Sequence, residues 1–280
     1  MSIRDLLTGG EVSLTPAEER IAQVLLNDYP TSGLGTASSL AKRASVSDPT
    51  VIRLVVKLGF DGFPAFQASL LGEVEDRLRS PLSMMAGGGG VLGEASGYIA
   101  SARDAVDEAA RLTPQRSYEK AARLINEARS VLAVGGRFSG FLAGMLVQHL
   151  EQFRPGVRWL PDLSLSSYDQ LVDLGRRDVI LAFDYRRYQT DVMSFVSRAA
   201  DGGTRVVLFT DRWQSPLAAR ADVSLVAPVE VASPYDTMAP AVAQLEALIA
   251  QILSTEDRGR RARIERIEAI RAATRVTASN

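Results

Sequence analysis

The sequence predicts an α/β protein with a separate all-α N-terminal domain. Its 280 residues exceed the usual length of a single domain. Before residue 80 the apolar spacing is helical throughout, whereas five short apolar runs of β type alternate with helical segments in the second part of the chain. Ser80-Pro81 and four consecutive glycines at 87–90 separate the two patterns. We therefore expect a helical domain over 1–80, a glycine-rich linker over 81–93 and an α/β domain over 94–280.

Composition narrows the chemistry that the chain can perform. Hydrophobic residues make up 46% and charged residues 23%, as in an ordinary folded protein. The chain has no cysteine and a single histidine, His149, which excludes disulfides, thiolate metal sites and histidine clusters. No metal or cofactor is expected. Because the net charge is -1, any attraction to nucleic acid must come from local clusters of basic residues.

The sequence also predicts where the protein works. Its first ten residues lack a basic end followed by a long apolar core, as a secretion signal would require. No later stretch reaches about 18 uncharged apolar residues, the length needed to cross a bilayer. We expect a cytoplasmic protein with no membrane partner.

In the N-terminal region, the pattern begins with a clear helix start at Thr15-Pro16. Further on, residues 36–60 divide into a helix, a tight turn near 44–47 and a second helix, the arrangement of a helix-turn-helix. Ser47 suits the N-cap of the second helix, and Gly59 suits a left-handed residue at its end. Three rings are expected to be buried under this hairpin: Phe60, Phe63 and Phe66.

The second helix of the hairpin has one apolar and one polar face. Val51, Ile52 and Val55 are expected to pack against the first helix at Leu40 and Ala41. The opposite face should present Thr50, Arg53 and Lys57, and four basic residues stand against one acid between residues 36 and 60. A solvated helical hairpin would show the same helical pattern, but the clustered positive charge favours DNA. The residues predicted to bind DNA are Lys42, Ser47, Thr50, Arg53 and Lys57.

Several short motifs in this hairpin resemble the N-terminal domain of RpiR-type transcriptional regulators. They are Leu40-Ala41, the spaced residues Ser47, Thr50-Val51 and Arg53, and the run Lys57-Leu58-Gly59-Phe60 continued by Gly62-Phe63. The resemblance implies binding to double-stranded operator DNA. It also implies that a sugar isomerase (SIS) domain follows the linker.

The second part of the chain resembles such an SIS domain from about residue 115 to 253. Helical patterns at 94–112 and 115–128 precede the apolar runs, which lie at 131–134, 157–160, 179–183, 206–209 and 223–226. This alternation predicts a five-stranded parallel sheet covered by helices on both faces. The resemblance implies a flavodoxin-like strand order, in which the first and third strands are neighbours and the loops after them share one ligand crevice.

Those two loops depart from the SIS pattern. After the first strand, Gly135 and Ser139 match a phosphate-binding loop, but Arg137 replaces its second glycine. After the third strand, the serine and threonine positions of the family are occupied by Asp184, Arg186 and Gln189. The residues predicted to bind an effector are Gly135, Arg137, Ser139, Asp184, Arg186, Arg187 and Gln189.

The replacements predict the chemistry of the effector. Arg137, Arg186 and Arg187 bring three positive charges to the two loops, and arginine binds phosphate or carboxylate with paired hydrogen bonds. An anionic sugar derivative or sugar acid is therefore expected. The competing interpretation is an ion pair between Asp184 and Arg186 or Arg187 that closes an empty crevice.

The sequence is compatible with three functions. The leading one is a ligand-responsive, non-enzymatic transcriptional regulator. The second is an SIS-type sugar-phosphate isomerase or lyase, which would need a carboxylate such as Glu230 beside His149; yet the helical spacing around His149 favours a packed or interface histidine. The third is a protein-interaction module whose crevice has lost its ligand.

Two features bear on assembly. Paired operator half-sites require two-fold symmetry, so we expect a homodimer or a homotetramer formed mainly by the SIS domain. Residues 258–275 carry seven arginines, with Ile264, Ile267 and Ile270 at three-residue spacing. This spacing predicts an amphipathic helix that docks on its own or a partner subunit, with a second nucleic-acid surface as the alternative.

Overall fold

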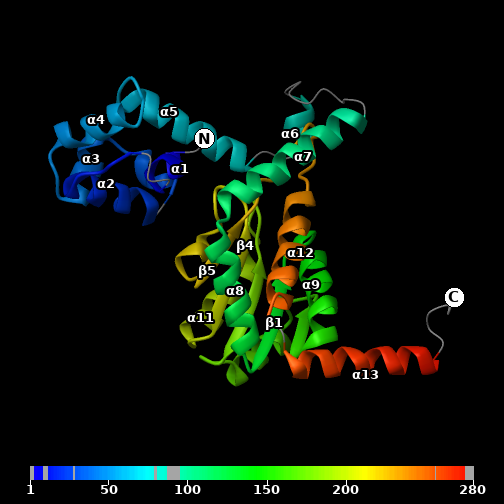
Figure 1. The fold of residues 1–280 in the computed structure, drawn as a ribbon. Helices are drawn as coiled ribbons and strands as arrows, with labels where there is room; N and C mark the ends of the chain where they lie inside the picture. Colours follow the sequence, from blue (N-terminus) through cyan, green and yellow to red (C-terminus); the bar gives the residue numbers. More distant parts are fainter. Residues whose placement is uncertain are drawn as a thin grey trace. The chain divides into compact units, whose positions relative to one another are not determined.

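The computed structural model describes residues 3–8, 12–27, 29–78, 81–86, 95–255 and 257–274. It separates into two compact units, Met1–Ser83 and Met84–Asn280 (Figure 1). Between the two sequence patterns, Pro81–Ala86 forms a short helix, α6, where the sequence predicted the start of a linker. The four glycines of that linker lie outside the described residues.

The N-terminal unit consists of helices, as predicted. They are α1 (Ile3–Thr8), α2 (Pro16–Asn27), a 3-10 turn (Thr31–Gly33), α3 (Ala37–Ala44), α4 (Asp48–Lys57) and α5 (Phe63–Leu78). The start of α2 is a capping box, because Thr15 N–H donates to Glu18 Oε2 at 2.8 Å while Glu18 N–H donates to Thr15 Oγ1 at 3.4 Å. Apolar side chains from all these helices form one core, with Ile21, Leu54 and Phe66 fully buried.

Helices α3 and α4 form the predicted helix-turn-helix. Thr36 caps α3 by accepting a hydrogen bond from Ser39 N–H at 3.1 Å. The helix ends because Ser45 adopts a left-handed conformation with φ 52°, after which Ser47 is the N-cap residue of α4. One expectation about α4 is wrong: Ile52 is 38% exposed, since it lies on the outer side of the helix.

The end of α4 turns the chain sharply into α5. Gly59 has φ +94°, and Phe60 N–H donates to the carbonyl of Val55 at 3.2 Å, which satisfies the last turn of the helix. The predicted aromatic cluster is present. The Phe60 and Phe66 rings meet edge to face at 5.5 Å, and the Phe63 and Phe66 ring centroids are 5.7 Å apart.

The C-terminal unit is an α/β domain whose five strands occur where the apolar runs predicted them. In chain order its elements are α7 (Ala95–Leu112), α8 (Gln115–Glu127), β1 (Ser130–Gly135), α9 (Ser139–Phe153), β2 (Val157–Leu160), α10 (Leu165–Asp169), a 3-10 turn (Gln170–Asp173), β3 (Asp178–Phe183), α11 (Thr190–Asp201), β4 (Arg205–Thr210), a 3-10 turn (Pro216–Ala219), β5 (Val223–Val226), α12 (Ala239–Leu253) and α13 (Arg258–Thr274). The predicted tail helix is therefore present as α13, but none of its residues is buried, and Ile264 and Ile270 are 37% and 61% exposed.

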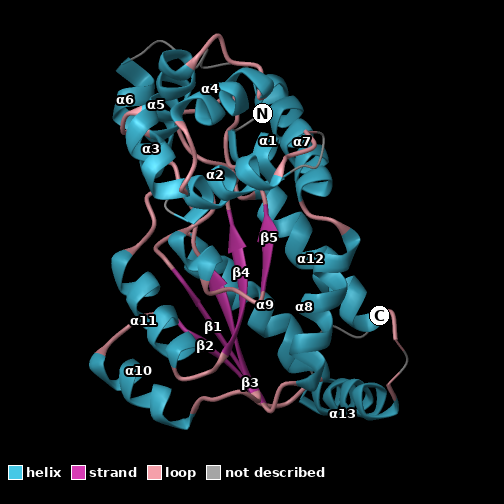
Figure 2. Ribbon diagram, turned by 90° about the vertical axis from the view of Figure 1, so that its left-hand side faces the viewer, coloured by secondary structure: helices cyan, strands magenta, loops and turns pink. Residues whose placement is uncertain are grey.

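All strand pairs are parallel, in the order β2-β1-β3-β4-β5. Alternate residues of each strand point to opposite faces, so Val131 and Ala133 join one buried cluster while Leu132 and Val134 join another. Helices α8, α9 and α12 cover the first face, and α11 covers the second (Figure 2). This is the predicted layered, flavodoxin-like architecture.

The sheet topology positions a crevice. Strands β1 and β3 pair from Ser130 opposite Asp178 to Gly135 opposite Phe183. The chain leaves β1 toward α9 and leaves β3 toward α11, which lie on opposite faces of the sheet. The loops at these two carboxyl ends therefore diverge from neighbouring strands and leave a hollow between them.

Candidate functional site

The outer surface of the helix-turn-helix carries exposed basic side chains. Lys42 on α3 and Arg53 on α4 are both exposed. The side chain of Arg53 is oriented by a hydrogen bond from its guanidinium to Thr50 Oγ1 at 3.3 Å. Arg53 is thus held near the N-terminal half of α4, and Ile52 and Val56 are exposed on the same helix.

Three other residues predicted to bind DNA have partners within the protein. Thr50 is buried rather than presented on the outer face, and its hydroxyl lies 2.9 Å from Ser47 Oγ. Lys57 donates to the carbonyl of Ser13 at 2.6 Å and pairs with Glu18 at 2.8 Å. The ammonium group of Lys57 holds the pKa of Glu18 below its ordinary value. Lys57 therefore connects the end of α4 to the start of α2.

The hollow between the loops after β1 and β3 has a volume of about 320 Å³. Three of the residues predicted to bind an effector line it: Gly135, Arg137 and Gln189. Gly135 must be glycine, because a Cβ at this position would lie 2.8 Å from the backbone nitrogen of Gly140. The loop backbone can therefore approach a ligand closely.

Hydrogen bonds fix the shape of the loop after β1. Ser139 Oγ accepts from Gly136 N–H at 2.9 Å and donates to the carbonyl of Phe183 at 2.8 Å, which ties this loop to the end of β3. Arg137 N–H donates to Gln189 Oε1 at 3.1 Å, so Gln189 joins the two crevice loops. The Arg137 side chain remains exposed, with its guanidinium 5.7 Å from the centre of the Phe138 ring.

Asp184 points into the protein and not into this crevice. It is buried, accepts from Gln189 N–H at 3.2 Å and accepts a short hydrogen bond from the Ser215 hydroxyl. These contacts connect the loop after β3 with the loop after β4. The carboxylates that do line the crevice are Asp162 and Asp191, which the sequence analysis did not identify.

The two adjacent arginines after β3 have different environments. Arg186 has a side chain only 3% exposed, and its Nε donates to Asp236 Oδ2 at 2.8 Å. Its guanidinium also lies 5.9 Å from the Trp213 ring. Arg187 is exposed, with φ +67°. The buried ion pair that the sequence suggested does involve Arg186, but its partner is Asp236 from the segment before α12, not Asp184.

Asp211, at the end of β4, is a buried acid that the sequence analysis assigned only to the fold. Its Oδ1 accepts hydrogen bonds from the Tyr188 hydroxyl and from Trp213 N–H, both at 2.9 Å. Burial raises the pKa of Asp211 to about 7 despite these hydrogen bonds. The carboxyl group therefore titrates near neutral pH and supports the loop that carries Tyr188 and Gln189.

The residue pair required by an isomerase is not assembled within one chain. His149 lies on α9 beside Trp159 of β2, in a second hollow of about 350 Å³. Glu230 follows β5, where its carboxylate accepts from Val229 N–H at 3.1 Å and lies 3.7 Å from Arg212 Nε. Because β2 and β5 are the two edges of a five-stranded sheet, about 19 Å of strand spacing separates these two edges.

The described residues contain no group of three or more histidine, aspartate or glutamate side chains arranged to hold a metal ion. None of the helices described is both long and apolar enough to cross a membrane.

Comparison with known protein families gives two matches along the chain. The model of the rpiR-family helix-turn-helix domain matches residues 1–77, and the model of the SIS domain matches residues 124–252. Each range lies within one of the two units described above. The N-terminal domain therefore belongs to the rpiR-family helix-turn-helix domains. The expected combination of a helix-turn-helix with an SIS domain is confirmed.

Curated relatives include regulators and longer proteins. An uncharacterised HTH-type transcriptional regulator from Clostridium perfringens is 22% identical to this chain over 228 residues, covering 80% of this chain and 81% of the relative. A bifunctional protein glk from Burkholderia mallei is 27% identical over 216 residues, covering 76% of this chain. The match covers 33% of that longer relative.

Solved structures share the fold. The sugar isomerase domain of an RpiR transcription factor from Sphaerobacter thermophilus aligns with a TM-score of 0.59 and 23% identity, over 61% of this chain and 96% of that domain. The Vibrio vulnificus NanR protein, solved with ManNAc-6P, aligns with a TM-score of 0.58 and 16% identity over 98% of both chains.

Proposed function

We propose that this protein is a transcriptional regulator that binds operator DNA through α4 and a small anionic sugar derivative in the crevice between β1 and β3. The observation that carries the proposal is the presence, in one chain, of a helix-turn-helix with exposed basic residues and an SIS domain with a hollow between the loops after β1 and β3. Its place of action is the cytoplasm, where operator DNA is available.

The exposed side of α4 is the DNA-reading surface in this proposal. Arg53 can hydrogen bond to a guanine edge, and the exposed side chains of Ile52 and Val56 can contact thymine methyl groups. Lys42 supplies a phosphate contact from α3. Ser47, Thr50 and Lys57 act mainly by fixing the start and the end of α4, because their polar groups have partners within the domain.

Arg53→Ala tests the DNA surface. Loss of a base contact should weaken binding to the operator by about 1–3 kcal/mol and weaken binding to random duplex much less. Fluorescence anisotropy with a fragment of the promoter next to the gene gives both affinities. Arg123→Ala on α8 is the matched control, since it removes the same charge from the other unit. Equal weakening on both duplexes would assign Arg53 to a phosphate contact.

The crevice favours a ligand with an anionic group at the loop after β1. Backbone amides there surround the start of α9, and the exposed Arg137 can approach the anion. Asp162 and Asp191 can accept hydrogen bonds from sugar hydroxyls. ManNAc-6P, the ligand of the NanR structure, has both kinds of group and is a suitable first probe.

Calorimetry with sugar phosphates, sugar acids and neutral sugars tests this assignment. We expect binding of anionic sugars only, and a loss of about tenfold or more in affinity for Arg137→Ala. Arg187→Ala should have a smaller effect, because Arg187 does not line the hollow. Binding of neutral sugars with equal affinity would contradict the proposed chemistry. Turnover of a sugar phosphate by the purified protein would favour the isomerase alternative.

A second copy of the chain is the proposed partner of the α9 face. Phe138 is 61% and Phe141 70% exposed, and together with Trp159 they form an apolar surface that continues into the crevice. Paired half-sites on DNA need two-fold symmetry, which this face can supply. Phe141→Glu should shift the sedimentation of the protein toward the monomer, whereas Val172→Glu, at an exposed position outside this face, should not. A dimer unaffected by Phe141→Glu would refute this interface.

A further inference from the structure

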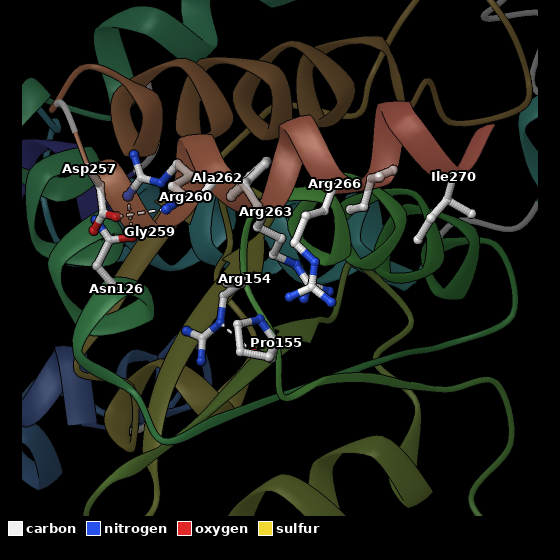
Figure 3. A pocket seen from close by; sticks show the side chains of 12 residues that line it. Asn126, Arg154, Pro155, Asp257, Gly259, Arg260, Ala262, Arg263, Arg266 and Ile270 are labelled. Carbon is white, nitrogen blue, oxygen red and sulfur yellow. Dashed lines mark hydrogen bonds between the residues drawn. The ribbon is translucent and has the colours of Figure 1, made fainter. Parts of the chain in front are cut away.

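A second cavity, separate from the crevice, lies against α13. Its volume is about 570 Å³, and it is bounded by the start of α13 and by the ends of α8 and α9 at Asn126 and Phe153 (Figure 3). Asn126 precedes β1, and Pro155 precedes β2. The cavity is therefore at the amino ends of the strands, whereas the crevice is at their carboxyl ends.

Four arginines line this cavity: Arg154, Arg260, Arg263 and Arg266. Arg260, Arg263 and Arg266 recur every three residues along one side of α13. Figure 3 shows the side chains of Arg263 and Arg266 extending from that helix toward Arg154 and Pro155. No carboxylate is paired with any of the four among the described residues.

Main-chain carbonyls hold three of these arginines in place. Arg154 donates to the carbonyls of Ala128 and Pro155, at 2.9 and 3.1 Å, and to that of Ile125. Arg263 donates twice to the carbonyl of Glu151, and Arg260 donates to Ile252 and Thr255. Each guanidinium has five N–H groups, so all three retain unused donors. Partial burial lowers the pKa of Arg154, because no acid offsets the desolvation of its guanidinium.

The charges around the cavity do not cancel. The ends of α8, α9 and α12 contribute roughly half an elementary negative charge each, and Asp257 contributes about one more. Asp257 is also used as the cap of α13, where it accepts from Arg260 N–H at 2.8 Å. The amino end of α13 adds roughly half a positive charge, so together with four guanidinium groups an excess of about two positive charges faces the cavity.

Arg266 differs from the other three arginines, because its side chain does not bind the described main-chain carbonyls at a helix end. It lines the cavity without any hydrogen bond or ion pair to the described residues. Its neighbours Arg261 and Arg271, in contrast, pair with glutamates of the same helix at 3.1 Å. Arg266 is exposed, so the cavity is open to solvent on this side. Unneutralised guanidinium groups that face one hollow are an arrangement suited to phosphate, which they bind with paired hydrogen bonds.

We propose that this cavity is a second ligand site, which binds a small phosphate-bearing anion through Arg263 and Arg266. Arg154 and Arg260 complete the positive surround, and Phe153 and Ile267 provide an apolar wall for a larger group attached to the phosphate. Since the site and the crevice lie at opposite ends of the strands, the two ligands can be bound at the same time. The proposal does not depend on the proposed effector crevice.

Titration of the full-length protein with pyrophosphate, followed by calorimetry at low ionic strength, tests the site. We expect saturable binding at one site per chain. Arg266→Ala should reduce the affinity about tenfold, and the double variant with Arg263→Ala should abolish binding. Arg261→Ala is the matched control, because it removes the same charge from α13 at a residue that does not line the cavity.

Further variants separate this site from the crevice and from DNA. Arg137→Ala should leave pyrophosphate binding unchanged, while Arg266→Ala should leave sugar binding in the crevice unchanged. Absence of saturable binding, or an equal loss in Arg261→Ala and Arg266→Ala, would overturn the proposal. It would also fail if Arg266→Ala weakened duplex DNA binding without changing pyrophosphate affinity, because α13 would then be a nucleic-acid surface.

Discussion

The buried ion pair between Arg186 and Asp236 predicts that Arg186 stabilises the fold and does not bind a ligand. Sequence reasoning placed Arg186 among the effector-binding residues, whereas its side chain is 3% exposed and that of Asp236 is 15% exposed. Replacing one member of a buried pair leaves the other charge without compensation, at a cost of about 3–5 kcal/mol. We expect Arg186→Met to reduce the free energy of unfolding of the C-terminal unit by this amount.

Thermal and urea unfolding measure the effect. For a unit of this size, the expected loss corresponds to a decrease in Tm of about 6–20 °C. Arg187→Ala is the control, because this adjacent arginine is exposed and its removal should change stability by less than about 0.5 kcal/mol. Adding Asp236→Leu to Arg186→Met should restore part of the loss, since the unpaired carboxylate is then absent.

The opposite outcome would refute this reasoning. If Arg186→Met unfolds within about 1 kcal/mol of the wild-type protein but no longer binds an anionic sugar, then the guanidinium contributes to the ligand and not to the fold. If the double variant is no more stable than Arg186→Met, the pair with Asp236 is not the source of the effect.

Three further predictions follow from local geometry. Asp211→Asn should flatten the pH dependence of the free energy of unfolding. The pKa of this acid is near 3.8 in the unfolded chain and about 7 in the folded protein, so the stability of the wild-type protein falls by up to about 4 kcal/mol as the pH rises between these values. Urea unfolding from pH 4 to 8 measures this slope. Gly135→Ala should lower the free energy of unfolding by about 1–3 kcal/mol and distort the crevice loop. The control is Gly97→Ala on α7, where a Cβ meets no atom and the protein should keep its stability; thermal unfolding compares the two variants. Lys57→Met should cost less than about 1 kcal/mol at neutral pH. Because the pKa of Glu18 is lowered in the folded state, the difference from wild type should shrink as the pH falls below the ordinary pKa of glutamate and disappear once Glu18 is protonated in the folded protein. Urea unfolding across this acid range measures it, and a difference that persists in strong acid would show that the ion pair is not its cause.

The sequence by itself determined the five strands and the main helices of both domains, because the signals involved are local. Alternating apolar runs located all five strands, and Ser47, Gly59 and their neighbours located the helix-turn-helix. These features depend on backbone preferences within a few residues. They required no knowledge of which distant segments meet. The order of the strands came from the resemblance to the SIS domain and was confirmed by the sheet.

Only the tertiary structure decided which charged residues face a ligand. Arg186 and Arg187 are adjacent in the chain, yet one is paired with Asp236, 50 positions away, and the other is exposed. Thr50 was expected to be exposed and is buried, whereas Ile52 was expected to be buried and is exposed. The reason is the same, because burial depends on which helix packs against α4. The arginine-lined cavity likewise forms where α13 meets the ends of α8 and α9, which lie more than a hundred residues earlier in the chain. Electrostatic environment is set by all neighbours in space, and a pattern along the chain contains only the neighbours in sequence.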